Sequence, residues 1–519
     1  MGIVGWFSPS LKTLATRSLA GSALRISAAN LVFVTLSTLQ VLVVGAVFGT
    51  SRAYEIFVLA WMLPDWCLLG LGNVMQLHLT PTLLGIAARE GESGLQDAAW
   101  SLAISVTALL AGVCGLGALL AYPALGLLAP GLAGDELDRT VLVFRFLMLT
   151  AFLQGLVKLL GSLHRVGHSL VVAAMAQAGT PLAVIGLLLW ASALGTWVFV
   201  LGFTLGALVQ IAVLLPALRG WRLLRPRSRL DPAVMKDLAT SALPLLLATT
   251  GFRLVVLLGR TVASGLDRGD VAVLRYAFFF LMAVQGLLIM PVLSVGYNRL
   301  SALASAGRRG ATEAVLLMIK ILWTLVLPAT LVQVLFARPL VDVFLGRQAF
   351  DAGAVARTSQ VLAAYALTLP FLAGHLVALQ AFLSRRRLGF VTLLGLVFPA
   401  LGLVLNLLLS ARWGVLGIAI ATPVTMAAWF LALLVRLLPE AEAEARRRAG
   451  SYAGRLLLAS GLALGALGSG WHLLPASPFP RLVLGGGALL ALYAVALLGV
   501  ARQPLRLIWN EFSQTRMGT

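Results

Sequence analysis

Residues 243–265 read LPLLLATTGFRLVVLLGRTVASG, an apolar run long enough to cross a membrane that carries arginines at positions 253 and 260. A guanidinium near the bilayer midplane costs from about 3 to over 10 kcal/mol, so it persists only beside a partner or a water-filled cavity. Arg253 and Arg260 are seven residues apart, which places both on one face of a helix. Arg275 begins the next apolar run. A positively charged interior of this kind favours an anionic cargo.

The composition excludes a soluble globular protein. Of the 519 residues, 60% are hydrophobic and only 11% are charged, and the mean hydropathy is +0.97. The formal net charge is +20, but the basic residues lie in short loops between apolar runs. There they orient the chain in the membrane and give no reason to expect nucleic acid as a partner. Cys67 and Cys114 lack metal-ligand or redox spacing and are interpreted as packing residues.

Hydropathy predicts an all-α polytopic membrane protein with about fourteen spans. About three times as many of the 39 Lys and Arg residues fall on the N-terminal side of the membrane as on the other side, which predicts two cytoplasmic ends. Pro64, next to Asp65, predicts a kink or a break in the second span. The predicted spans are 22–49, 54–86, 98–128, 140–163, 168–192, 195–218, 238–265, 271–297, 314–337, 356–384, 388–411, 415–437, 453–473 and 481–501.

Two charged loops divide these spans into groups of six, six and two. Two six-helix lobes facing each other across a cavity are a common transporter plan. The predicted parts are an N-terminal lobe at 1–218, a basic cytoplasmic loop at 219–237, a C-terminal lobe at 238–437, a charged cytoplasmic loop at 438–452, and spans thirteen and fourteen with a tail at 453–519.

The candidate substrate-binding residues are polar groups within or beside the spans. Arginine binds phosphate through paired, charge-assisted hydrogen bonds. Each arginine could instead form a structural ion pair or extend its side chain to the membrane surface, and Gln40 could equally join helices. The candidates are Arg253, Arg260, Arg275, Arg25 and Gln40.

Two carboxylates lie inside an apolar run. Asp65 could neutralise an arginine, titrate as a coupling group, or bond to backbone amides freed by Pro64. Glu55 is a second candidate charge partner, nearer the outer end, where contact with water is expected. Asn406 is a polar group within a span that either joins helices or contacts substrate.

Several local patterns, in order along residues 25–435, resemble the MviN/MurJ family of lipid II flippases, within the multidrug/oligosaccharidyl-lipid/polysaccharide exporter superfamily. The family also has fourteen spans. The matching residues are Phe48-Gly49 with Glu55 and Leu63-Pro64-Asp65; Ala129-Pro130-Gly131 with Thr140 and Arg145; Ala263-Ser264 with Gly269 and Tyr276-Ala277; Arg347, Phe350 and Asp351 with Tyr365, Pro370 and Ala381-Phe382; and Asn406 with Gly414, Gly417 and Ala421-Thr422.

The resemblance implies two six-helix lobes with a lipid-facing groove formed by spans thirteen and fourteen. It implies a transporter and not an enzyme: a monomeric flippase that moves a polyprenyl-pyrophosphate-linked saccharide across the bacterial inner membrane by alternating access. No metal or other cofactor is implied; the energy source is left open between an ion gradient, the membrane potential and downstream consumption of the product.

This chain departs from the family pattern at several positions. Val34 and Gln40 replace family arginines in the first span, and Phe278-Phe279 replaces an Asp-Arg pair in the eighth. Gly259 replaces the acid implicated in sodium coupling. The glycan is therefore left open between that of lipid II and that of an exopolysaccharide or O-antigen lipid.

Two other classes of function compete with the flippase. A cation-coupled multidrug antiporter would favour carboxylates in the interior, whereas this chain places more arginine than acid there. A membrane-embedded enzyme would need clustered acids, histidines or metal-ligand spacing, and the sequence shows none.

Overall fold

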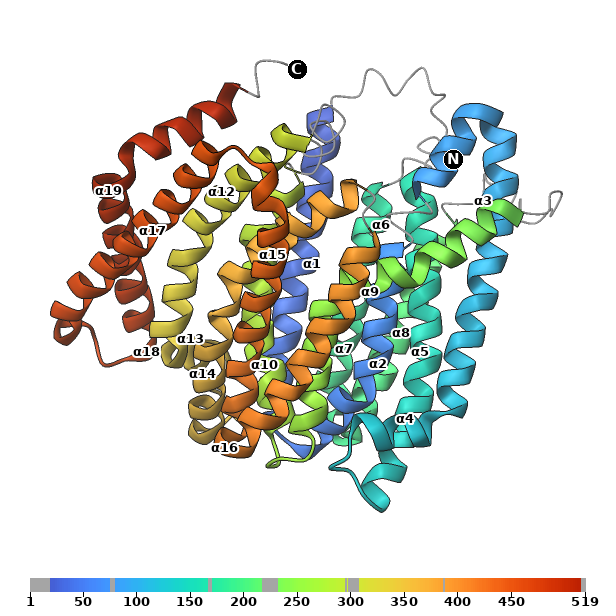
Figure 1. Cartoon of the computed structure of the whole chain (residues 1–519). Coiled ribbons are helices and arrows are strands. Elements are labelled where there is room, and N and C mark those ends of the chain that lie inside the picture. Colours follow the sequence, from blue (N-terminus) through green and yellow to red (C-terminus); the bar gives the residue numbers. More distant parts are fainter. Residues whose placement is uncertain are drawn as a thin grey trace. The chain divides into compact units, whose positions relative to one another are not determined.

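The computed structural model (Figure 1) is built from helices, and the part of the chain that it describes contains no strand. This confirms the predicted all-α fold. The chain divides into two compact units, Met1–Thr250 and Gly251–Thr519. The boundary falls inside α9 (Pro232–Ala263). The described residues are 19–74, 80–166, 170–216, 232–294, 296, 308–385 and 388–514.

In the first unit, α5 packs against α2, α3 and α8, while α1 packs against α6 and α7. Polar side chains join these helices: Gln154 and Gln210 both donate to the Thr180 hydroxyl, at 3.1 and 2.5 Å. The helices are α1 (Leu19–Phe48), α2 (Arg52–Val74), α3 (Thr80–Leu119), α4 (Ala121–Leu128), α5 (Asp135–Val166), α6 (Leu170–Ala176), α7 (Gly179–Ala191), the short η4 (Ser192–Leu194) and α8 (Trp197–Leu214).

The second predicted span, 54–86, includes α2 and the start of α3, and residues 75–79 between them lie outside the described part of the chain. Helix α2 ends at Val74, and α3 begins at Thr80 and contains a non-helical residue, Gly91, with φ 73°. Helix α2 also continues through Pro64, so the predicted break does not occur there. Membrane helices tolerate an internal proline because neighbouring groups can satisfy the freed backbone carbonyl.

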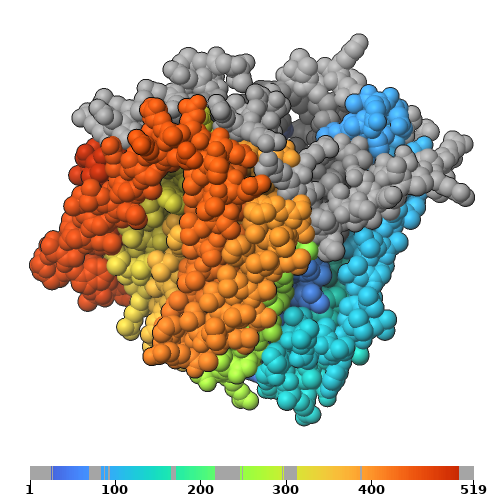
Figure 2. Space-filling view, in the orientation of Figure 1, coloured from blue at the N-terminus to red at the C-terminus, as the bar shows by residue number. Residues whose placement is uncertain are grey.

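The helices of the second unit pack around α12, α14 and α15, and Figure 2 shows α16 covering a broad part of the visible face of this unit. The elements after α9 are α10 (Asp270–Val284), the π-helix η6 (Gln285–Ile289), α12 (Arg308–Leu335), α13 (Ala337–Leu345), α14 (Ala352–Ala366), α15 (Thr368–Ser384), α16 (Leu388–Leu437), η7 (Leu438–Glu440), α17 (Ala443–Ser469), η8 (Trp471–Leu473), α18 (Pro478–Pro480), η9 (Arg481–Gly485) and α19 (Gly486–Gln514).

Helix α16 contains two of the predicted spans. It is 50 residues long, far more than the roughly 20 that one crossing requires. It breaks at Gly414, whose φ of 55° is in the left-handed region that favours glycine. The break lies between the predicted spans 388–411 and 415–437, as expected from their boundaries.

Within the described residues, nine helices are long and apolar enough to cross a membrane, or ten if α14 and α15, bent by 41°, form one broken span. One of the nine is the double-length helix around α16. Helices α2, α9 and α17 overlap three further predicted spans. The protein is thus a multi-span membrane protein; the number fourteen is consistent with these helices and stays a prediction, as do the domain limits and the cytoplasmic ends.

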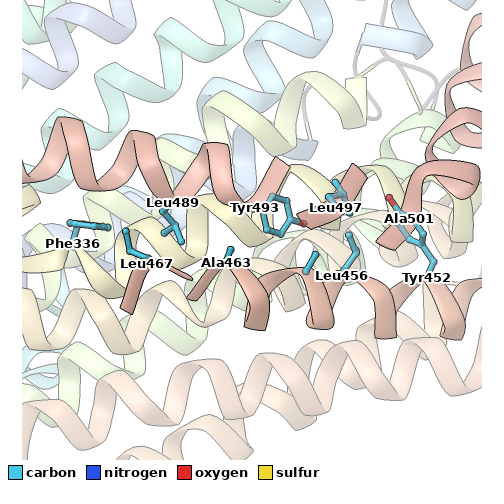
Figure 3. Packing of buried hydrophobic residues seen from close by; sticks show 10 residues of the cluster. Phe336, Tyr452, Leu456, Ala463, Leu467, Leu489, Tyr493, Leu497 and Ala501 are labelled. Carbon is cyan, nitrogen blue, oxygen red and sulfur yellow. The ribbon is translucent and has the colours of Figure 1, made fainter. Parts of the chain in front are cut away.

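Helices α17 and α19 pack side by side through an apolar seam (Figure 3). The Tyr452 hydroxyl lies 2.7 Å from that of Thr324 on α12, which ties α17 to the helices before it. The buried members of the seam are Phe336, Tyr452, Leu456, Ala459, Ala463, Leu467, Leu489, Tyr493, Leu497 and Ala501.

The segment between α13 and α14 carries Arg347, Phe350 and Asp351, one group of residues that resembles the family pattern, and two of them make structural contacts. Asp351 is the N-cap of α14, where its Oδ1 accepts a hydrogen bond from the backbone N–H of Ala354 at 2.7 Å. Phe350, only 2% exposed, meets Tyr276 of α10 edge to face at 5.2 Å. Arg357 on α14 forms an ion pair with Asp270 on α10 at 3.5 Å. The motif therefore joins α14 to α10.

Replacing Asp351 by alanine should destabilise the protein by about 1 kcal/mol, because the first turn of α14 loses its side-chain cap. The measurement is the melting temperature of the detergent-solubilised protein. Asp351→Asn should retain most of the stability, since its amide oxygen accepts the same bond. Equal melting temperatures for the alanine variant and the parent would contradict the capping role.

Candidate functional site

Helix α9 turns one face toward α16 and places its arginines on the opposite face. A Cβ added at Gly251 would lie 2.4 Å from the Trp429 ring, and one at Gly259 would lie 3.0 Å from Ile418. These glycines allow close approach of the two helices. Because successive residues turn by about 100°, Arg253 and Arg260 point away from the glycine face. The same-face arrangement expected from their spacing is present.

The two arginines meet at one aromatic ring of α10. The guanidinium carbon of Arg253 lies 5.0 Å from the centroid of Phe278, and that of Arg260 lies 5.5 Å from it. Arg260 is 6% exposed and Phe278 is 2% exposed, whereas Arg253 is half-buried. The ring therefore lies within cation–π distance of both cations.

Other buried polar groups lie beside this part of α9. Tyr365 of α14 is hydrogen bonded to Thr422 of α16 and interacts electrostatically with Arg260. Asn406, only 1% exposed, lies beside α9, and a Cβ at Gly259 would be 3.5 Å from its Nδ2. Neither amide atom of Asn406 has a hydrogen-bond partner among the described residues. This part of the second unit is thus polar and cationic although it is buried.

Of the predicted site residues in the second unit, the structure places Arg253 and Arg260 at one ring and Asn406 against the same helix. Arg275 lies on α10, half-buried, three residues before Phe278. Sequence reasoning noted Phe278 only as a departure from a family pattern. It missed that the ring contacts both arginines, because that contact depends on the packing of α9 against α10.

The other predicted residues belong to the first unit. Arg25 is exposed on α1, just before the span that begins at Ser27. Gln40 on α1 and Asp65 on α2 are half-buried. None of these three has a role that the structure assigns.

Glu55 was expected to be in contact with water, and this was wrong. It is 1% exposed and forms an ion pair with Arg52 at 3.0 Å. Arg52 also binds Glu136 of α5, at 2.7 Å. The hydrogen bond that Arg52 donates to Glu136 is the largest of the effects that raise the pKa of Arg52. Arg52 thus pairs with Glu55, three residues away on α2, and its second ion pair, with Glu136, joins the N-terminal ends of α2 and α5.

Replacing Arg52 by methionine should destabilise the protein by about 1 to 2 kcal/mol, because the buried Glu55 carboxylate loses its ion pair with Arg52. The exposure of Arg52 and Glu136 limits the loss, since water screens part of the pair. The double variant Arg52→Met with Glu55→Leu should recover stability in a thermal-unfolding assay. A double variant less stable than the single one would contradict this explanation.

The comparisons with known proteins agree with the fold. The family model of the lipid II flippase MurJ matches residues 44–474. A protein of Synechocystis sp., described as a probable lipid II flippase MurJ, is 26% identical over 404 residues, which cover 72% of this chain and 73% of that protein.

Two solved structures show the same architecture. The lipid II flippase MurJ in an inward closed conformation matches with a TM-score of 0.77 at 14% identity, over 92% of this chain and 99% of that one. An inward-facing multidrug resistance MATE family transporter matches with a TM-score of 0.61 at 16% identity, over 83% of this chain and 99% of its own. The family model covers most of the sequence, and on that ground this chain belongs to the lipid II flippase MurJ family, whose members are transporters and not enzymes.

Proposed function

We propose that this protein is a flippase that moves a polyprenyl-pyrophosphate-linked saccharide across the bacterial inner membrane by alternating access. The glycan is that of lipid II or of an exopolysaccharide or O-antigen intermediate. The transporter works as a monomer with both ends in the cytoplasm, and an ion gradient or the membrane potential drives it. Membership in the flippase family supports the class of activity.

The observation that carries the proposal is the pair of guanidiniums against one buried ring, at 5.0 and 5.5 Å. A pyrophosphate offers several anionic oxygens, and arginine binds such groups through two parallel hydrogen bonds. Binding in a region shielded from bulk water strengthens these contacts. Arg253 and Arg260 are therefore the proposed ligands of the pyrophosphate.

The same charges disfavour a multidrug antiporter for organic cations. Cationic drugs near Arg253 and Arg260 would be repelled, and like-charge contacts of this kind cost several kcal/mol in general. The likeness to MATE transporters supports the fold alone, at 16% identity.

A leaflet-specific assay of labelled polyprenyl-linked glycans tests the proposed function. Cells depleted of this protein should accumulate the intermediate on the cytoplasmic leaflet, and re-expression should restore its appearance on the outer leaflet. Measuring lipid II and O-antigen intermediates in parallel identifies the glycan. Unchanged lipid intermediates together with altered dye efflux would instead support the antiporter.

A further inference from the structure

The position of Phe278 is fixed by α10 and its neighbours. Phe252 of α9 packs against the ring with a centroid distance of 6.1 Å. Two residues away, the backbone carbonyl of Phe280 accepts a hydrogen bond from Gln333 Nε2 at 2.8 Å, and Tyr276 is held against Phe350. These contacts hold α10 in place on both sides of Phe278. The ring is therefore fixed, and the flexible side chains of the two arginines extend to it.

The two cation–ring contacts also limit the separation of the charges. Seven residues of helix place the Cα atoms of Arg253 and Arg260 about 10.5 Å apart along the axis. The guanidinium carbons lie 5.0 and 5.5 Å from the centroid of one ring, so both side chains end beside the same residue of α10. A benzene ring attracts cations through its quadrupole and has no formal charge, so this attraction leaves the charge of both arginines in place.

We propose that Phe278 is a positioning residue for recognition of a diphosphate. Its ring holds the guanidiniums of Arg253 and Arg260 beside one point of α10, and because it carries no charge it cancels neither of theirs. This inference rests on the proposed function, in which these arginines bind the pyrophosphate. A carboxylate at position 278 would also attract the arginines but would remove one unit of net positive charge. A leucine would fill the space but would not attract a cation.

The arrangement implies a preference within the class of polyprenyl phosphates. Two guanidiniums held by one ring match a ligand with two linked phosphates better than a ligand with one. Phe278 should therefore affect the binding of a lipid pyrophosphate strongly and the binding of a lipid monophosphate weakly.

Graded fluorination of Phe278 tests this role, because fluorine withdraws charge from the ring face with little change in shape. The full-length protein in nanodiscs would carry phenylalanine, 4-fluorophenylalanine or 3,4,5-trifluorophenylalanine at position 278. The probes are purified lipid II and undecaprenyl monophosphate. We expect the affinity for lipid II to fall stepwise, by about 5- to 30-fold for the trifluoro ring, and the affinity for the monophosphate to change less than threefold.

Phe280 provides the matched control. It lies on the same helix, is 5% exposed, and packs against Phe344 with a centroid distance of 6.0 Å. Among the described residues, no arginine or lysine makes a cation–π contact with the Phe280 ring. Fluorination at 280 should leave the affinity unchanged, and equal melting temperatures across the series would show that packing is retained.

The outcomes separate this inference from the proposed function. A graded loss at 278 with no loss at 280 supports the positioning role. Undiminished lipid II binding by the trifluoro protein, or an equal loss at both positions, overturns it and leaves the flippase proposal standing. Failure of the unmodified protein to bind either lipid overturns the proposed function and this inference with it.

Discussion

Replacing Arg253 by alanine should abolish outward movement of the lipid-linked glycan while the protein still inserts and folds. Charge-assisted hydrogen bonds contribute about 1.5 to 3 kcal/mol each, and a bidentate contact loses two of them. Binding should therefore weaken at least a hundredfold. The measurement is the leaflet-specific assay in depleted cells complemented with the variant, together with lipid II binding to the purified protein.

Two further variants show whether the effect is specific to this site. Arg253→Lys keeps the charge but loses the planar fork, so it should retain part of the binding. Arg412→Ala removes an exposed arginine elsewhere in the second unit and should leave transport unchanged. Full activity of Arg253→Ala, at normal abundance in the membrane, would remove Arg253 from the mechanism.

Replacing Gly417 by alanine should prevent α16 from forming its sharp internal turn. A Cβ at this position would lie 2.1 Å from the backbone oxygen of Leu409 and 2.7 Å from the backbone nitrogen of Ser410. Backbone atoms cannot move aside as a flexible side chain can, so the two halves of the helix must separate. We expect a loss of about 3 kcal/mol or more, measured as thermal unfolding in detergent and as lower abundance in the membrane.

Gly461 on α17 offers the matched substitution. No atom lies within 4 Å of a Cβ placed there, and the residue is exposed on its helix. Gly461→Ala should be neutral or slightly stabilising, because alanine favours helix. Similar behaviour of the two alanine variants would show that the close contact at Gly417 is not what constrains α16.

Most of the fold could be predicted from hydropathy, because a span long enough to cross the bilayer leaves a simple signal in the sequence. The signal is ambiguous at the C-terminal limit of the second span. Residues 80–93 mix apolar and charged residues. Their mean hydropathy therefore does not distinguish the end of a span from a helix at the membrane surface. The sequence also gives no direct sign that the chain breaks at Gly91.

The candidate site could be predicted only in part. Helical spacing placed Arg253 and Arg260 on one face, and the structure agrees with this. Their common contact, Phe278, depends on the rotation of α10, which the packing of Tyr276 and Gln333 decides and no local pattern encodes. Glu55 was mistaken for a residue in water because its distance from the span end was known, whereas its pairing with Arg52 was not.

The groups beside the Phe278 ring are guanidiniums, and their high pKa determines how the substrate can be released. Arginine stays protonated at any pH that a cell tolerates. A change in pH therefore does not weaken its binding of phosphate, as it would for histidine. Release of the lipid pyrophosphate then requires that the two guanidiniums move apart or that another cation binds the phosphates. Turnover should accordingly respond to ionic strength and divalent metal far more than to acidity between about pH 5 and 9.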